Sequence, residues 1–293
     1  MLFRSEAAPA RPDLVRIVRA KLSAADLPSA EAWVEDWRRD YGADVTYWDA
    51  MGWLARGAAM LDDEERALAL AREILEGIPE PREELLGALG AALETEGRIR
   101  AARQGSAAGA AYFREAATRS PDPAFRSRMW KNVNRLELVG RPAPPLAAGE
   151  AVGGAVPTLD ALRGRPVLLF FWAHWCGDCR ASVPALARLS QRFASRGLAI
   201  VAPTRLYGTG EGNQEIGPED ERRHIAKVLA DQYAALPGLP VPVDTEAMVR
   251  YGASSTPTFV LVDREGIVRL YAPTRLTEAA LAAALEPLLG AEP

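Results

Sequence analysis

The sequence has few of the side chains that bind metals or act as nucleophiles. Its 293 residues include two cysteines and two histidines. A structural zinc site needs four ligands, so it would have to draw on all four of these side chains. The net charge of −4 and the pI near 5.5 exclude the strongly basic character of a nucleic-acid-binding protein. Apolar runs also fall short of the ~20 residues of a membrane-spanning helix.

Both cysteines belong to one motif, Trp175-Cys-Gly-Asp-Cys179, which lies between an apolar run and a helical pattern. A strand that enters a helix through Cys-x-x-Cys is typical of a thiol–disulfide site. The first N–H groups of a helix have no intrahelical partner and carry partial positive charge. A sulfur there is stabilised as thiolate, so its pKa falls below the ~8.5 of a free cysteine. We predict a redox-active Cys176–Cys179 disulfide that needs no other cofactor and no metal.

The spacing of apolar residues makes the two sulfurs unequal. Apolar side chains follow Cys179 at steps of three and four, so Cys179 heads the face that packs on the sheet and should be buried. Cys176 lies at the helix mouth beside Trp175 and should meet solvent. We assign Cys176 as the nucleophile and Cys179 as the thiol that resolves a mixed disulfide with the substrate. Half a zinc site and a static structural disulfide are the alternative interpretations.

The segments around the motif predict an α/β domain. Residues 166–172 are continuously apolar, as in a central strand that is covered on both faces. Residues 198–202 form a second apolar run. The segments 259–263 and 267–271 predict an antiparallel hairpin, and Thr277 is a plausible N-cap for a closing helix.

From Arg141 to the C-terminus the chain resembles the thioredoxin superfamily, and most closely its TlpA-like thiol–disulfide oxidoreductases. The segments that carry this likeness are an entry segment (142–146), a first hairpin that leads into the central strand (158–173), Pro184 as the proline that bends the active-site helix, and Thr256-Pro257 as the cis-proline. The resemblance implies a thioredoxin-like α/β fold, a mixed sheet flanked by helices, over residues 141–293.

The resemblance also assigns roles that the residues alone do not. A cis Thr256–Pro257 bond close to Cys176 would present the backbone N–H and C=O of Thr256 to an extended substrate segment, and would exclude metal from the dithiol. Trp175, Thr256 and Pro257 are therefore the expected substrate-binding residues. The partners that the resemblance implies are disulfide-containing protein substrates and a membrane-bound thiol electron donor.

Three residues depart from the family pattern. Phe170 stands where thioredoxin has a buried aspartate, and Ser182 stands where some reductive members place a glutamate. Water or His174 is left as proton acceptor for Cys179. Asp178 places an anion at the helix start, which should raise the pKa of Cys176 and make the couple more reducing.

Two further features each allow two interpretations. His174 is either a modulator that donates to the thiolate or relays protons, or a solvated ring at a strand end. The other histidine, His224, is expected on the surface of a charged helix. The glycine-rich segment 205–217 is expected to be a mobile loop that serves as a substrate-shaping lid or is a neutral insertion.

We expect residues 1–140 to form a second, α-helical domain with repeat-like helix pairs of the tetratricopeptide kind. Proline and glycine separate the helical patterns, which cover 12–24, 30–41, 45–60, 63–76, 81–104, 107–119 and 123–138. The proline-rich segment 141–145 marks the boundary with the redox domain. Tryptophans 33, 37, 48, 53 and 130 are either core residues or the lining of a groove for a protein partner.

Together these patterns predict a thiol–disulfide oxidoreductase that reduces disulfides of exported proteins. The family that the chain resembles is normally exported, but residues 2–5 carry no secretory signal. We therefore expect a periplasmic or other extracytoplasmic protein whose export signal is missing from this chain. If Met1 is the true start, we expect a cytoplasmic protein. The alternatives are a copper-handling protein and a partner-binding protein with a vestigial redox site. A peroxidase fits less well because the chain lacks Thr-x-x-Cys.

Overall fold

The computed structural model describes residues 11–146, 151–153 and 156–289. The chain divides into two compact units, Met1–Arg103 and Gln104–Pro293. Residues 2–5, on which the expectation about a lost export signal depends, lie outside the described residues. Within the described part, none of the helices combines the length and the apolar character that crossing a bilayer requires.

The described part of the first unit is helical. It contains α1 (Leu14–Ser23), α2 (Leu27–Tyr41), α3 (Val45–Met60), α4 (Glu64–Gly77), a short 3-10 turn (Glu83–Leu85) and α5 (Leu86–Gln104). The first four helices each begin at an aspartate whose carboxylate accepts a backbone N–H of the first turn, which satisfies a donor that has no partner within the helix. The helices predicted here are confirmed, whereas a tetratricopeptide arrangement stays a prediction.

The tryptophans of this unit mostly belong to its core. Trp37 is buried and donates its Nε1–H to Asp44 at 3.0 Å. Trp48 and Trp53 are half-buried and pack against the same core, in which α3 contacts α1, α2 and α4. Only Trp33 is exposed among these four side chains. These positions favour the core interpretation over a groove lined by all of the tryptophans.

Two helices that precede the predicted boundary pack within the second unit. These are α6 (Ser106–Ala116) and α7 (Pro123–Glu137), and α7 lies against α10 (Thr245–Arg250). Ser127 donates to the carbonyl of Met248 at 3.1 Å, and Asn134 donates to the carbonyl of Arg250 at 2.9 Å. The contacts therefore divide the chain near residue 104, before these helices. A domain boundary at 140 and 141 stays a prediction from the sequence.

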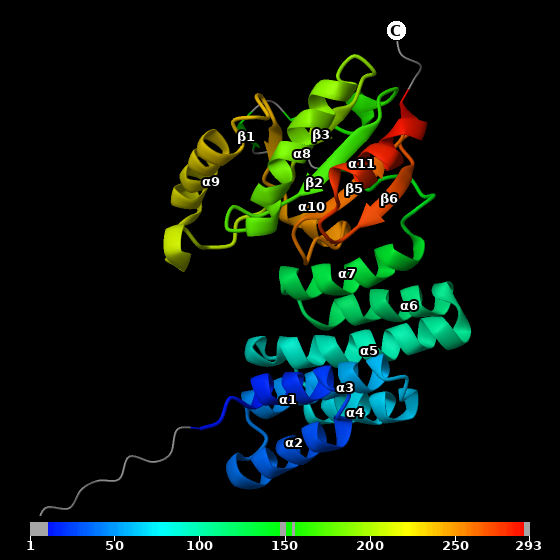
Figure 1. The fold of residues 1–293 in the computed structure, drawn as a ribbon, viewed down its shortest axis with the longest axis vertical. Coiled ribbons are helices and arrows are strands. Elements are labelled where there is room, and N and C mark those ends of the chain that lie inside the picture. The colour runs from blue at the N-terminus through cyan, green and yellow to red at the C-terminus, as the bar shows by residue number, and fades with distance from the viewer. Residues whose placement is uncertain (1–10, 147–150, 154–155, 290–293) are drawn as a thin grey trace, which may run out of the picture. The chain divides into compact units, whose positions relative to one another are not determined.

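The second unit is built on a four-stranded mixed sheet (Figure 1). Its order is β3 (Ala199–Val201), β2 (Val167–Phe171), β5 (Thr258–Val262) and β6 (Val268–Ala272). The β2–β3 pair is parallel, and the other two pairs are antiparallel. All residues of β2 and β5 are buried, as a central strand with two covered faces requires. The strands predicted around the motif are thus confirmed.

Three elements of this unit were not predicted, and one predicted element is absent from residues 158–173. Strands β1 (Ala151–Gly153) and β4 (Pro240–Pro242) form a separate antiparallel pair, and α10 follows β4. The predicted first hairpin over 158–173 is wrong, because residues 160–162 form a 3-10 turn that leads directly into β2.

Alternate residues of β2 point into two separate cores. Leu168 and Phe170 lie in the core that includes α8 (Gly177–Phe193), α9 (Pro218–Gln232) and α11 (Glu278–Leu285). Leu169 and Phe171 face the core that includes α10, and the α8 and α10 helices lie on opposite sides of the sheet in Figure 1. The covered sheet thereby fixes where β2 ends and where α8 begins.

Replacement of Asp44 by alanine should destabilise the first unit. Asp44 caps α3 by accepting the N–H of Tyr47 at 2.9 Å, and the same oxygen accepts the indole N–H of Trp37. The variant loses the cap of α3 and leaves the buried indole N–H of Trp37 without its acceptor. These losses should lower the free energy of unfolding by about 1–2 kcal/mol. Chemical denaturation would measure this change. The matched control is Asp36→Ala, because Asp36 pairs only with exposed Arg39 on α2 and should leave the midpoint nearly unchanged.

Candidate redox site

Cys176 and Cys179 form a disulfide at the start of α8, with 5.3 Å between their Cα atoms. Cys176 is the N-cap of the helix, and its sulfur accepts the backbone N–H of Cys179 at 3.1 Å. This arrangement places the sulfur of Cys176 against the unpaired donors of the helix terminus.

The two cysteines differ less in exposure than the sequence predicted. Cys179 is fully buried, but Cys176 is also buried, with 4% of its surface exposed. The expectation that Cys176 meets solvent is therefore wrong in degree. The segment that contains Thr256 covers it, because the carbonyl oxygen of Thr256 lies 3.4 Å from the Cys176 sulfur.

The cis Thr256–Pro257 bond predicted from the resemblance is present. Pro257 is buried at the start of β5, and Thr256 is half-buried beside Cys176. On the other side of the motif, Trp175 leaves about half of its surface (49%) exposed. The fold thus brings residues 256 and 257 to the motif from 80 positions away in the sequence. A substrate-binding role for these residues stays a prediction.

The two departures from the family pattern are filled by structural contacts. Phe170 stacks on Phe259 with ring centroids 5.3 Å apart. Ser182 is buried and donates its hydroxyl to the carbonyl of Asp178 within α8, at 2.8 Å. Neither side chain provides the carboxylate that family members place at one of these two positions.

His174 is buried, so its interpretation as a solvated ring is wrong. Its Nε2 lies 3.1 Å from Oε1 of Glu221, which is fully buried on α9. Glu221 also accepts the backbone N–H groups of Tyr207 and Gly208, at 2.7 and 2.8 Å. His224 is half-buried, and its ring packs edge-on against His174 at 5.0 Å, so it is not only a surface residue.

Glu221 was missed in the sequence because it lies in a helix of exposed charges, where glutamate is normally solvated. A carboxylate can be buried only when donors satisfy its oxygens. Those donors come from segments 13 to 47 residues away. A pattern read along the helix alone has no signal for them.

The turn that presents Cys176 is held by the same group of residues. The N–H of Cys176 donates to the carbonyl of Ala173 at 3.0 Å, so His174 and Trp175 occupy the middle of a tight turn. His174 is held by Glu221, and the Trp175 ring lies edge-on to Tyr207 at 5.4 Å. Both central residues of the turn are therefore anchored by side-chain contacts outside it.

The glycine-rich segment 205–217 has defined hydrogen bonds of its own. The N–H of Gly210 donates to the backbone carbonyl of Gln214 at 2.8 Å, and the N–H of Ile216 donates to the carbonyl of Gly208 at 3.1 Å. Thr209 and Glu215 form an antiparallel bridge. The expected mobile loop is thus a folded excursion that is fixed to Glu221 at its base. Whether it acts as a lid stays a hypothesis.

Asp178 lies in the first turn of α8, exposed, with the guanidinium of Arg275 at 3.7 Å. The side chains of Asp178 and Arg275 expose 68% and 51% of their surface, so solvent screens this pair strongly. Asp178 nevertheless remains an anion that lies between the two cysteines in the sequence.

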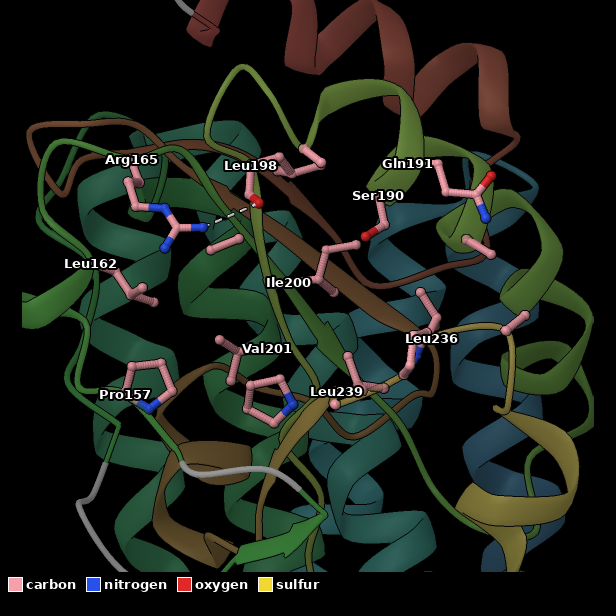
Figure 2. A pocket seen from close by; sticks show the side chains of 17 residues that line it. Pro157, Leu162, Arg165, Ser190, Gln191, Leu198, Ile200, Val201, Leu236 and Leu239 are labelled. Atoms are coloured by element: carbon pink, nitrogen blue, oxygen red, sulfur yellow. Dashed lines mark hydrogen bonds between the residues drawn. The ribbon is translucent and has the colours of Figure 1, made fainter.

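Two cavities differ in their relation to the disulfide. A cavity of about 350 Å³ is lined by His174, Trp175, the 210–213 segment and one side of α9. A second one, of about 430 Å³, lies between the end of α8, β3 and the 235–240 segment (Figure 2). Its lining is mostly apolar and contains neither cysteine, and its Arg165 donates to the carbonyl of Leu198. Neither cysteine lines the first cavity, but His174 and Trp175, which directly precede Cys176, do, so the first cavity is the one that adjoins the redox site.

The described residues contain no cluster of three or more histidine, cysteine or acidic side chains that could hold a metal ion. The chemistry that this arrangement supports is thiol–disulfide exchange. It combines two sulfurs at a helix start, a neighbouring backbone carbonyl and an exposed aromatic ring.

Comparison with known proteins agrees with this chemistry. Residues 139–271, less than half of the chain, match the AhpC/TSA family. The chain is 28% identical over 131 residues to the thioredoxin-like protein YneN of Bacillus subtilis, an alignment that covers 44% of this chain and 68% of YneN. It is 29% identical over 143 residues to the thiol-disulfide oxidoreductase ResA of the same organism, with 47% and 69% covered.

Among solved structures, the exposed lipoprotein thioredoxin Etrx1 of Streptococcus pneumoniae is 26% identical, with a TM-score of 0.38. The alignment covers 47% of this chain and 98% of Etrx1. The C-terminal half is similar in sequence to a thioredoxin-like protein and to thiol–disulfide oxidoreductases. Its mixed sheet with helices on both faces is the arrangement that the resemblance implied. These alignments cover about half of the chain.

Burial of His174 should make the stability of the protein depend on pH. Burial lowers the pKa of His174 below its ordinary 6.5, more than the neighbouring Glu221 raises it, and His224 lowers it further. The imidazole of the unfolded chain therefore takes up a proton at a higher pH than the imidazole of the folded chain. The free energy of unfolding consequently falls as the pH drops through 6.5. The contribution of one such group is at most about 1.4 kcal/mol per pH unit.

The variant His174→Gln should remove this contribution while keeping an amide donor for Glu221. Denaturation midpoints measured from pH 7.5 to 5 should fall less steeply for this variant than for the wild type. The comparison variant is His224→Gln, which removes only the smallest of the influences on the pKa of His174 and should therefore flatten the slope less than His174→Gln does. Identical slopes for the wild type and His174→Gln would contradict the assignment of a neutral buried imidazole.

Proposed function

We propose that this chain is a dithiol–disulfide oxidoreductase that reduces disulfides of exported proteins through Cys176 and Cys179. One observation carries the proposal: the disulfide lies at the first turn of α8, and the backbone carbonyl of Thr256 faces its outer sulfur at 3.4 Å. The similarity to ResA and YneN supports the same reaction class.

In the proposed reaction the reduced chain attacks the substrate with the Cys176 thiolate. This attack breaks the substrate disulfide, forms a mixed disulfide and releases one substrate thiolate, which takes up a proton. The Cys179 thiol then loses its proton and attacks the Cys176 sulfur, which releases the second substrate thiolate. The substrate gains two electrons and two protons, and the chain is left with the Cys176–Cys179 disulfide.

The contacts of the N-cap sulfur are consistent with these unequal roles. The N–H of Cys179 points at the Cys176 sulfur at 3.1 Å, where it would stabilise a thiolate. Cys179 is buried beneath, so a substrate sulfur can approach only Cys176. The exposed Trp175 ring and the Thr256–Pro257 backbone flank that approach and would bind the substrate segment.

The electron donor, the location and the role of the helical unit are also proposals. Reduction of many substrate molecules needs a thiol donor that restores the dithiol, and we propose a membrane-bound one in an extracytoplasmic compartment. Within the described part of the first unit, the large apolar side chains that are exposed and available to a partner are Trp33, Tyr41, Val45, Met60 and Leu61. A copper-handling or vestigial redox protein would be distinguished by reduction of insulin with and without Cu(I).

Replacement of Cys179 by alanine should trap substrates on Cys176. Without the resolving thiol, the mixed disulfide has no intramolecular exit, so adducts that a reductant can cleave should accumulate. Non-reducing gel electrophoresis with insulin as substrate would detect them. The matched variant Cys176→Ala should trap far less and lose insulin reduction. Equal trapping by both variants would contradict the assignment of Cys176 as the nucleophile.

The charge of Asp178 should make the couple more reducing. Asp178→His removes an anion from the helix start, which should stabilise the Cys176 thiolate and raise the reduction potential. A change on the order of 10–20 mV follows from the usual size of a charge effect at a helix terminus. Titration with a glutathione redox buffer would measure it. The control is Asp160→His, a comparably exposed position in the same unit. An unchanged or lower potential for Asp178→His would rule out this role.

A further inference from the structure

The cavity next to Trp175 has the position and size of a small substrate subsite. Its volume of about 350 Å³ lies at the low end of the range for small-molecule pockets, roughly 300–1,000 Å³. His174 and Trp175 form one wall, and they are the two residues that precede the reactive Cys176. Neither cysteine lines the cavity, so a molecule bound there would lie against the turn that presents Cys176.

Arg180 of α8 lines one side of the cavity, and Glu221 connects the three other segments that form its walls. It holds the turn through His174, and it holds the base of the 205–217 loop through the N–H groups of Tyr207 and Gly208. It also belongs to α9, whose side chains form the third wall. The cavity is thus a built feature with a fully buried connection beneath it.

One polar atom at the cavity wall lacks a partner. His174 exposes 2% of its surface, and its Nδ1 makes no hydrogen bond within the part of the chain that the structure describes. When Nε2 carries the proton that is shared with Glu221, the neutral ring presents Nδ1 as an acceptor.

Charges of both signs line the cavity without pairing. Arg180 and Lys227 are cationic, and Glu211 and Asp231 are anionic. None of these four side chains forms an ion pair with any residue in the described ranges, although many other charged side chains of the chain do. Lys227 and Asp231 are one helical turn apart on α9 and still do not meet. These groups are available to a ligand that carries both an ammonium and a carboxylate.

We propose that this cavity binds small disulfides built from amino acids, such as cystine or glutathione disulfide. Lys227 and Arg180 would contact carboxylates, and Asp231 and Glu211 would contact ammonium groups. This inference rests on the proposed function of the dithiol. Cys176 attacks one sulfur of the small disulfide, Cys179 resolves the mixed disulfide, and two small thiols leave with the two electrons and two protons of the dithiol.

Single-turnover oxidation of the reduced chain, followed by tryptophan fluorescence, would test the charges separately. 3,3′-Dithiodipropionate carries carboxylates only, cystamine carries ammonium groups only, and bis(2-hydroxyethyl) disulfide carries neither. We expect Lys227→Ala to slow the reaction with dithiodipropionate about fivefold, and Asp231→Ala to slow the reaction with cystamine about fivefold. Neither variant should change the rate with the neutral disulfide. Lys21→Ala, a lysine of the first unit, is the charge-matched control and should change no rate.

The outcomes separate this inference from the proposed function. Equal effects of a variant on all three small disulfides, or no effect on any, would overturn the subsite. An equal slowing of insulin reduction by Lys227→Ala would also overturn it, because the residue would then serve protein substrates or position the dithiol. If the wild type reduces insulin and these effects are absent, only the subsite fails. If the wild type reduces neither insulin nor any small disulfide, the proposed function itself fails.

Discussion

The redox site depends on one buried carboxylate. A carboxylate that has no contact with water must be satisfied by donors of the protein, and Glu221 receives them from His174, Tyr207 and Gly208. Those donors lie on the turn before Cys176 and on the loop after β3. Ordering of the loop and orientation of the turn are therefore two results of the same electrostatic requirement. Loss of any one donor would leave the others holding a charge that is only partly compensated.

The sheet supplies the second constraint on the site. Because β2 is covered on both faces, its end and the start of α8 have little freedom, and the N-cap position is fixed at Cys176. The neighbouring β5 begins at Thr258, directly after the cis bond, so pairing of β2 with β5 brings Thr256 to the sulfur. Strand register thus sets the distance between two segments that are 80 residues apart.

Local patterns of the sequence predicted most elements but few of the contacts between them. The helix Val45–Met60 was predicted with the observed bounds, because Asp44 caps it and its apolar periodicity is clear. The Cys176–Cys179 motif was identified from its own residues and its position before a helix, whereas the cis Thr256–Pro257 bond was predicted only through the resemblance to a family. The β1–β4 pair was missed, since three-residue strands that contain proline and glycine give almost no strand signal. The Glu221–His174 contact was missed because a buried glutamate contradicts the usual preference of its residue type.

The packing of α7 on α10 has a practical consequence for dissecting the molecule. Gly252 lies so close to the α7 backbone that a β-carbon there would come within 2.2 Å of the Lys131 nitrogen. Ser127 and Asn134 of α7 also satisfy carbonyls at the end of α10. A fragment trimmed to begin at the proline-rich segment would lose these partners and expose the apolar underside of α10 to water. Recombinant expression of the redox portion should therefore retain the chain from Ser106 onward to avoid aggregation.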